Sequence, residues 1–99
     1  MGIMRSLVWC GEVVDSNQDG IWKTTTNLIK VFAADHATLV TIDLAQLRFV
    51  DSSGAALMMK LKEWSRTLRL EIIFVNTRPT VRNILRLTAV DQLVLEGGQ

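Results

Sequence analysis

Four consecutive residues, Asp51-Ser52-Ser53-Gly54, carry the clearest potential for chemistry in this 99-residue chain. They follow an apolar run at 39–44 and precede apolar positions spaced three and four apart. This pattern predicts a strand, a turn, and a helix that begins at the turn. The first N–H groups of a helix lack intrahelical acceptors and attract an anion. A serine at this place therefore either caps the helix or carries a phosphate.

Strands and helices are predicted to alternate along a single domain, residues 1–99. We expect strands at about 3–13, 39–44, 71–76 and 93–96, and helices at about 21–34, 54–69 and 79–88. Pro79 suits the first turn of the last helix, where its missing N–H has no consequence. Such alternation indicates an α/β fold with right-handed crossovers and a mostly parallel sheet.

The composition is that of an ordinary globular domain with one core. Hydrophobic residues make up 48% and charged residues 21%, and the net charge of +1 gives no basic excess for nucleic acid. No apolar run approaches the roughly 20 residues of a membrane-spanning helix. Cys10 is the single cysteine and has no internal disulfide partner. We therefore expect a cytoplasmic protein without nucleic-acid binding or direct membrane insertion.

Catalytic groupings are scarce in the sequence. One histidine and one cysteine do not make a metal site, and no glycine-rich phosphate-binding motif occurs. A triad could be drawn from His36, Asp51 and Ser52 or Ser53. However, a strand at 39–44 would hold His36 about 20 Å from the turn. We predict no enzyme activity, no cofactor and no metal, and a surface position for His36.

The ordered motifs resemble STAS domains, the anti-sigma factor antagonist family. Besides Asp51–Gly54, residues 71–76 with 79–85 look like the next strand and helix of that family, and residues 87–93 are similar to its L-T-G-L-D-x-L close. Residues 38–96 match in order and spacing. The resemblance implies a mixed, mostly parallel sheet of about four strands whose first strand is antiparallel. STAS domains usually have two N-terminal strands, and the residues before Gly11 leave room for one.

The resemblance also implies a regulatory function. In partner-switching STAS proteins, the serine directly after the aspartate is phosphorylated by a kinase that is itself the anti-sigma factor. That residue is Ser52 here, and Ser53 is the second choice and a support for the turn. The expected partner is an anti-sigma factor or a serine kinase-like protein. The residues expected to bind it are Asp51, Ser52, Ser53, Gly54, Asp15 and Trp22.

One departure from the family pattern favours a second function. The first loop of the family commonly reads Gly-Glu-Leu-Asp, and its aspartate contributes to kinase recognition. This chain has residues 11–14 as Gly-Glu-Val-Val, with Asp15 one place late. STAS domains also serve as non-switching scaffold subunits of lipid ABC transporters and as cytoplasmic regulatory domains of sulfate-permease-type transporters. The intact serine turn favours the switch and the altered loop favours the scaffold; the sequence decides neither the partner nor the oligomeric state.

The tryptophans have two interpretations, core residue or partner anchor. Trp64 lies on the same helical face as Leu57 and Leu61, so we predict that it joins the core. Trp22 stands beside a turn-rich stretch and is the best candidate for an exposed aromatic.

Overall fold

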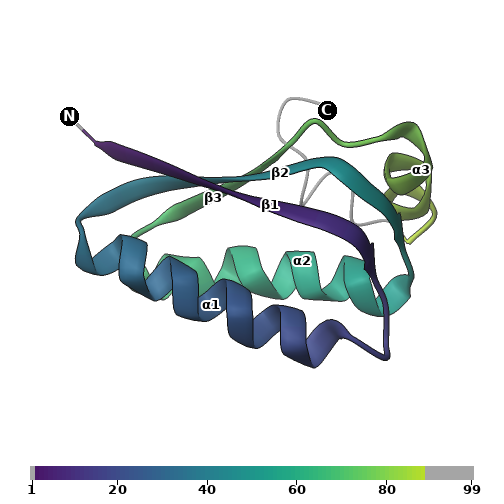
Figure 1. Ribbon diagram of the computed structural model, residues 1–99, viewed down its shortest axis with the longest axis horizontal. Helices are drawn as coiled ribbons and strands as arrows, with labels where there is room; N and C mark the ends of the chain where they lie inside the picture. Colours follow the sequence, from purple (N-terminus) through teal and green to yellow (C-terminus); the bar gives the residue numbers. More distant parts are fainter. Residues whose placement is uncertain (1, 89–99) are drawn as a thin grey trace.

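The computed structural model describes residues 2–88, which form three strands and three helices in alternation (Figure 1). The elements are β1 (Ile3–Val13), α1 (Gln18–Ala34), β2 (Ala37–Val50), α2 (Ser52–Ser65), the short 3-10 helix η1 (Arg66–Leu68), β3 (Glu71–Val75) and α3 (Pro79–Leu87). The strands form one sheet in the order β1-β2-β3. Helices α1 and α2 lie side by side on one face of this sheet, and α3 packs near the carboxyl end of β2 (Figure 1).

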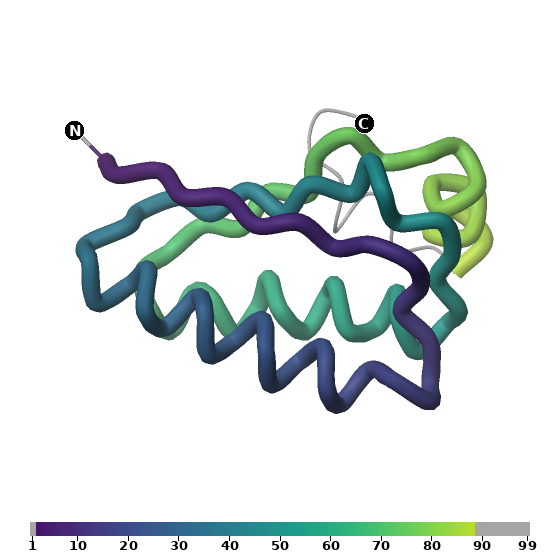
Figure 2. Tube along the Cα trace, in the orientation of Figure 1, coloured from purple at the N-terminus to yellow at the C-terminus, as the bar shows by residue number. Residues whose placement is uncertain are grey.

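Both strand pairs are parallel, so the expectation of an antiparallel first strand is wrong. Figure 2 shows the reason: α1 carries the chain back along the sheet, and β2 therefore starts at the same end as β1. An antiparallel pair would need a hairpin before α1, and the described residues hold one strand there. The sheet has three strands within residues 2–88 instead of about four, and the predicted strand at 93–96 lies outside the described residues.

Strand β2 is much longer than the predicted 39–44. It pairs with β3 only as far as Asp43, whereas its pairing with β1 continues to Val50. Among residues 2–88, the second half of β2 therefore has one neighbouring strand, and its exposed positions include Ala45, Gln46 and Arg48, which carry no strand signal. Between the paired ends, β1 advances ten residues (3 to 13) while β2 advances thirteen (37 to 50). The extra residues of the register shifts consequently belong to β2.

The core lies between the sheet and the helices α1 and α2. Its largest fully buried side chains come from β2, β3 and all three α-helices: Phe74, Ile29, Ile42, Leu44, Leu47, Met58, Leu61, Ile72 and Leu85. Trp9 of β1 closes the core, with its ring 5.6 Å from that of Phe74. The indole Nε1 of Trp9 donates to Thr25 Oγ1 at 3.1 Å, which explains why α1 tolerates a buried threonine.

Candidate partner-binding site at the Asp51 turn

Asp51 starts helix α2 by capping it. Its backbone is extended, with φ −99° and ψ −171°, and its carboxylate Oδ1 accepts a hydrogen bond from the backbone N–H of Gly54 at 3.0 Å. The carbonyl of Asp51 accepts the first helical bond from the N–H of Ala55, also at 3.0 Å. These bonds satisfy donors that a helix N-terminus otherwise leaves unpaired, so the helix begins at Ser52, two residues before the predicted start.

The same aspartate ties α2 to the loop between β1 and α1. Its Oδ2 accepts from the N–H of Asp15 at 3.0 Å, and its own N–H donates to the Val13 carbonyl at 3.3 Å. The carboxylate of Asp15 in turn accepts from Ser53 Oγ and from Gln18 Nε2, each at 3.3 Å. The structure therefore brings Asp15 into the turn, although this residue comes one place late in the sequence.

Hydrogen bonding keeps Asp51 ionised. The backbone N–H of Gly54 is the largest influence and lowers the pKa of Asp51 below its ordinary value of 3.8, and the N–H of Asp15 adds to this lowering against an opposing effect of burial. With Asp15 beside it, the turn presents two carboxylates at the start of a helix.

The two serines of the turn differ in what their hydroxyls do. Ser53 is half-buried, and its Oγ is engaged with the carboxylate of Asp15. Ser52 is exposed, and its Oγ makes no hydrogen bond within residues 2–88. Of the two hydroxyls, that of Ser52 is the more accessible from solvent.

Gly54 lets α2 approach β1 closely. It is buried, and an added Cβ would overlap the backbone carbonyl of Val13 and stand 3.0 Å from the Cβ of Val50. Backbone atoms cannot move aside as a flexible side chain can. A residue without a side chain is therefore required here for the turn to lie against the end of β1.

A family model described as the STAS domain matches residues 17–97 of the sequence. The chain belongs to the STAS domain family. The fold is similar to a solved structure of the anti-sigma factor antagonist SpoIIAA in its unphosphorylated form, with a TM-score of 0.66. The two chains are 21% identical, and the match covers 94% of this chain and 80% of that one. No curated protein sequence matches the chain.

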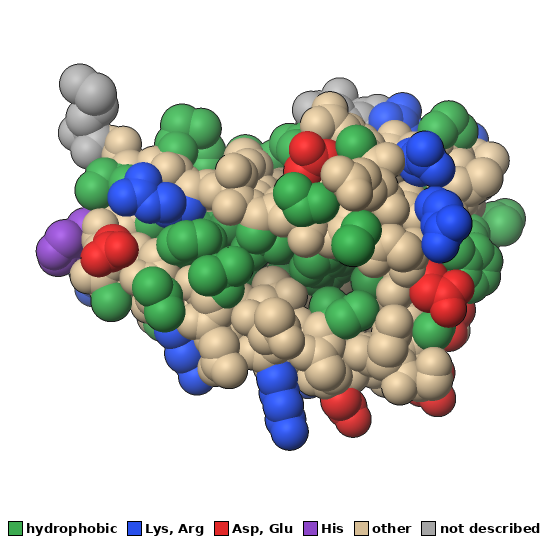
Figure 3. Space-filling view, viewed as in Figure 1, with side chains coloured by type: hydrophobic (Ala, Val, Ile, Leu, Met, Phe, Trp, Pro, Cys, Tyr) green, Lys and Arg blue, Asp and Glu red, His purple; other side chains and the backbone are tan. Residues whose placement is uncertain are grey.

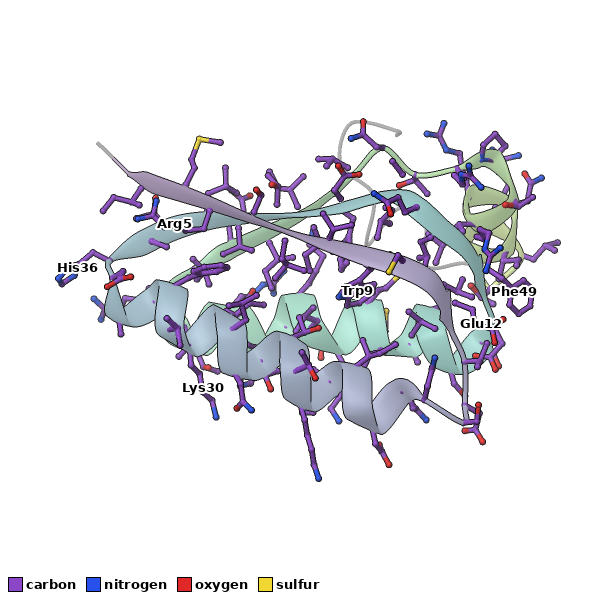
Figure 4. All side chains as sticks on the ribbon, viewed as in Figure 1. Arg5, Trp9, Glu12, Lys30, His36 and Phe49 are labelled. Atoms are coloured by element: carbon purple, nitrogen blue, oxygen red, sulfur yellow. The ribbon has the colours of Figure 1, made fainter. Side chains whose placement is uncertain are left out.

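An aromatic residue that the sequence did not single out as a site residue, Phe49, is exposed beside the turn. Phe49 is 43% exposed, lies two residues before Asp51, and is in register with Glu12 of β1. Figure 4 shows Phe49 and Glu12 at the same end of the molecule. The alternation of side chains along a strand could have predicted this exposure. Because Val50 points into the core, its neighbour Phe49 points outward.

Trp22, predicted as a partner contact, is not part of the hydrogen-bonded turn. It is half-buried between α1 and α2, where its ring meets that of Trp64 edge-on at 5.7 Å. Lys60 Nζ lies 4.6 Å from the centre of the Trp22 ring. These contacts give Trp22 a packing role between the two helices.

His36 lies far from the serines. It is exposed at the connection between α1 and β2, with a positive φ of 67°, and Figure 4 shows it at the opposite end of the molecule from Phe49. The His–Asp–Ser arrangement considered above is therefore not assembled. Residues 2–88 contain no group of three or more His, Cys, Asp or Glu side chains that could hold a metal ion. None of the helices in this part of the chain is long and apolar enough to cross a membrane.

Proposed function

We propose that this STAS domain is a regulatory protein-binding module that changes partners when Ser52 is phosphorylated. The observation that carries the proposal is the contrast between the two serines. Ser53 Oγ is engaged by Asp15, whereas Ser52 Oγ is exposed and unengaged within the described residues. A kinase can therefore reach Ser52 without opening the turn.

The position of Ser52 allows modification without loss of the fold. A phosphate adds about −1.5 to −2 charges, and the first turn of a helix is the place where a helix best accepts them. No hydrogen bond among the described residues depends on Ser52 Oγ, so none would be broken. The domain is therefore expected to stay folded in both states.

The same phosphate would weaken the binding of a partner that covers the turn. It would stand beside the carboxylates of Asp51 and Asp15, and a third negative group there has to be desolvated when the interface closes. Because about 1.4 kcal/mol corresponds to a tenfold change in affinity, a penalty of a few kcal/mol releases the partner. Phe49, exposed at the rim of this surface, is the side chain best suited to anchor it.

The proposed partner is an anti-sigma factor or a serine kinase-like protein in the cytoplasm. Membership of the STAS family and the fold shared with SpoIIAA support a partner of this kind. The placement of Asp15 in the turn also supports the switch, since the altered loop was the feature that favoured a scaffold.

The test uses the tagged full chain isolated from its own cells in several growth phases, as wild type and as Ser52→Ala, Ser52→Asp and Ser53→Ala. Mass spectrometry measures phosphopeptides and co-purified proteins together. We expect phosphate on Ser52 and not on Ser53. We also expect one protein to be retained by wild type, Ser52→Ala and Ser53→Ala and to be reduced at least about tenfold by Ser52→Asp.

Two results would contradict the proposal. One is an unmodified Ser52 in every growth phase, together with a partner that Ser52→Asp retains fully. The other is phosphate on Ser53 instead. A transporter ATPase present in equal amount with unmodified Ser52 would make the domain a scaffold subunit.

A further inference from the structure

One side of the molecule exposes apolar side chains away from the Asp51 turn. Five of the seven large hydrophobic residues that are exposed within residues 2–88 belong to β1 and α1: Ile3, Met4, Val8, Leu28 and Val31. Figure 3 shows hydrophobic side chains gathered between these two elements on the side facing the viewer. We name this side the β1–α1 face; it consists of the outer edge of β1 and the outward residues Gly20, Thr24, Leu28 and Val31 of α1.

Strand β1 leaves a row of backbone groups without a strand partner. It is at the edge of the sheet and pairs only with β2 within the described residues. Its path is regular, because the extra residues of the register shifts lie on β2 and the one positive φ in β1 is at Gly11, near its end. A regular edge strand of eleven residues, paired on one side only among the described residues, is a template for another extended strand.

A cavity of about 400 Å³ opens at the same place, between β1 and the first half of α1. Its lining includes Val8, Trp9 and Cys10 from the strand, and Ile21 and Thr24 from the helix. The edge of β1 is therefore part of a larger surface. Its backbone groups lie beside the cavity and beside the exposed apolar residues of α1.

We propose that the β1–α1 face binds a second copy of this chain, with the two β1 strands antiparallel about a twofold axis at Val8. Val8 is the midpoint of Ile3–Val13, so this arrangement overlaps the whole of both strands. Opposing residues then number i and 16 − i, which are both odd or both even. The two sheets therefore join with their α1 helices on the same side.

The charges of β1 favour an antiparallel second copy. Its charged residues are Arg5 near the start and Glu12 near the end, both exposed (Figure 4). In the proposed pairing Arg5 is opposite Gly11 and Glu12 is opposite Met4 of the second copy, so no like charges stand opposite each other. A parallel pairing would instead bring like charges together.

The helix positions fit the same twofold arrangement. Helix α1 packs against both β1 and β2, so its axis stands about one strand spacing from the symmetry axis. The two α1 helices would then be two strand spacings apart, about 10 Å, which is the distance at which helices pack. Gly20 and Thr24 are small enough for that approach, and Leu28 and Val31 supply apolar area.

The first experiment measures the mass of the full chain by light scattering and sedimentation from about 1 to about 500 µM. We expect a dimer that Val8→Lys and Val31→Lys each weaken at least about tenfold, because each places a charge in the joint. These residues are 54% and 58% exposed, so the monomer keeps its fold, which circular dichroism checks. Leu87→Lys is the matched control, since Leu87 is 85% exposed on α3, outside this face.

The second experiment tests the symmetry by disulfide formation in a Cys10→Ser background. A cysteine at Val8 would face its own copy across the axis, with opposing Cβ atoms about 4.5–5.5 Å apart, near the range that a disulfide spans. Val8→Cys is therefore expected to give a covalent dimer under mild oxidation. Met4 is also exposed but lies opposite position 12 of the second copy, so Met4→Cys should stay monomeric.

The proposal is overturned by a protein that remains monomeric at the highest concentration, which would assign the face to a different partner. A dimer that only Leu87→Lys dissociates, or one in which Met4→Cys cross-links and Val8→Cys does not, overturns it as well. None of these measurements uses the phosphorylation state of Ser52, so they stand apart from the proposed switch.

Discussion

The Asp51 turn and the β1–α1 face are both accessible to proteins, but they are built in different ways. At the turn, polar groups hold one another: Asp51 binds Gly54 and Asp15, and Asp15 binds Ser53. Ser52 is left exposed within this fixed frame. On the β1–α1 face the exposed side chains are apolar, and the outer edge of β1 pairs with no strand among the described residues.

This difference predicts different consequences for substitution. A change in the frame of the turn should alter the free energy of unfolding, because its bonds and contacts are made within the folded chain. A change on the β1–α1 face should alter association and leave the folded monomer nearly unchanged, because its side chains are exposed in a single copy.

Gly54→Ala should have the largest effect. An added methyl would overlap the Val13 carbonyl, so α2 and the end of β1 have to separate, and we expect a loss of about 3 kcal/mol in the free energy of unfolding. Urea unfolding followed by circular dichroism measures this loss. Gly20→Ala is the control, because its Cβ would meet no atom within 4 Å and alanine is the better helix former. Equal stability of Gly54→Ala and wild type would refute the close contact.

The Asp51 turn was the part of the molecule most open to prediction from sequence. Its strand, serines and glycine are consecutive, and local chemistry determines where a helix begins. The cap itself is the carboxylate of Asp51, and not the serine hydroxyl considered from the sequence. The alternation of strands and helices could also be predicted, because the spacing of apolar residues within each element is a local pattern. The hydrogen bonds from Asp15 and to Val13 were not, because they join segments about 36 residues apart and depend on how the crossovers pack.

Tertiary context also explains the predictions that were wrong or too short. The direction of β1 was taken from the family resemblance, and the α1 crossover makes it parallel. In the described part of the chain the second half of β2 pairs with a single strand, and its exposed positions include Ala45, Gln46 and Arg48, which lack strand propensity. Trp22 follows a turn-rich stretch, but its position on α1 directs its ring toward Trp64 of α2. The spacing of residues within α1 alone does not reveal this contact.

Helix α1 allows the comparison to be sharpened within one element. Trp22 is on its inner side, against Trp64 and Lys60, and Val31 is on its outer side. We expect Trp22→Ala to reduce the free energy of unfolding by about 2 kcal/mol, less than for a fully buried tryptophan because Trp22 is half-buried. Val31→Ala should change it by less than about 0.5 kcal/mol. Unfolding curves at a protein concentration at which the chain is monomeric provide the test. Equal losses for the two variants would show that the inner and outer sides of α1 do not differ in this way.

The charge of Asp51 predicts a response to acid. Its pKa is lowered in the folded protein, chiefly by the N–H of Gly54, so its ionised form stabilises the fold above the ordinary value of 3.8. This stabilisation disappears as the pH falls from 3.8 through the lower pKa of the folded state. Asp51→Asn keeps a capping oxygen but has no proton to take up, so its stability should fall less steeply over that interval.

Thermal unfolding between about pH 5 and about pH 2 compares the two proteins. Ser52→Asn, which places the same amide at the exposed neighbour of Asp51 and removes no ionisable group, is the control and should keep the wild-type slope. If Asp51→Asn also keeps that slope, the hydrogen bonds to Asp51 do not favour its ionised form.

The smallest expected difference separates the two serines, and it bears directly on the proposed switch. Ser53→Ala removes an exposed hydrogen bond to Asp15 and should reduce the free energy of unfolding by about 0.5 kcal/mol. Ser52→Ala removes a hydroxyl that bonds to nothing among residues 2–88, so we expect a change within about 0.3 kcal/mol, measured by urea unfolding with replicate curves. If Ser52→Ala were the more destabilising of the two, the Ser52 hydroxyl would be holding the turn, and a kinase could not use it without loosening α2. If Ser53→Ala is the more destabilising variant, the Ser53 hydroxyl stabilises the turn and the Ser52 hydroxyl does not contribute to the fold.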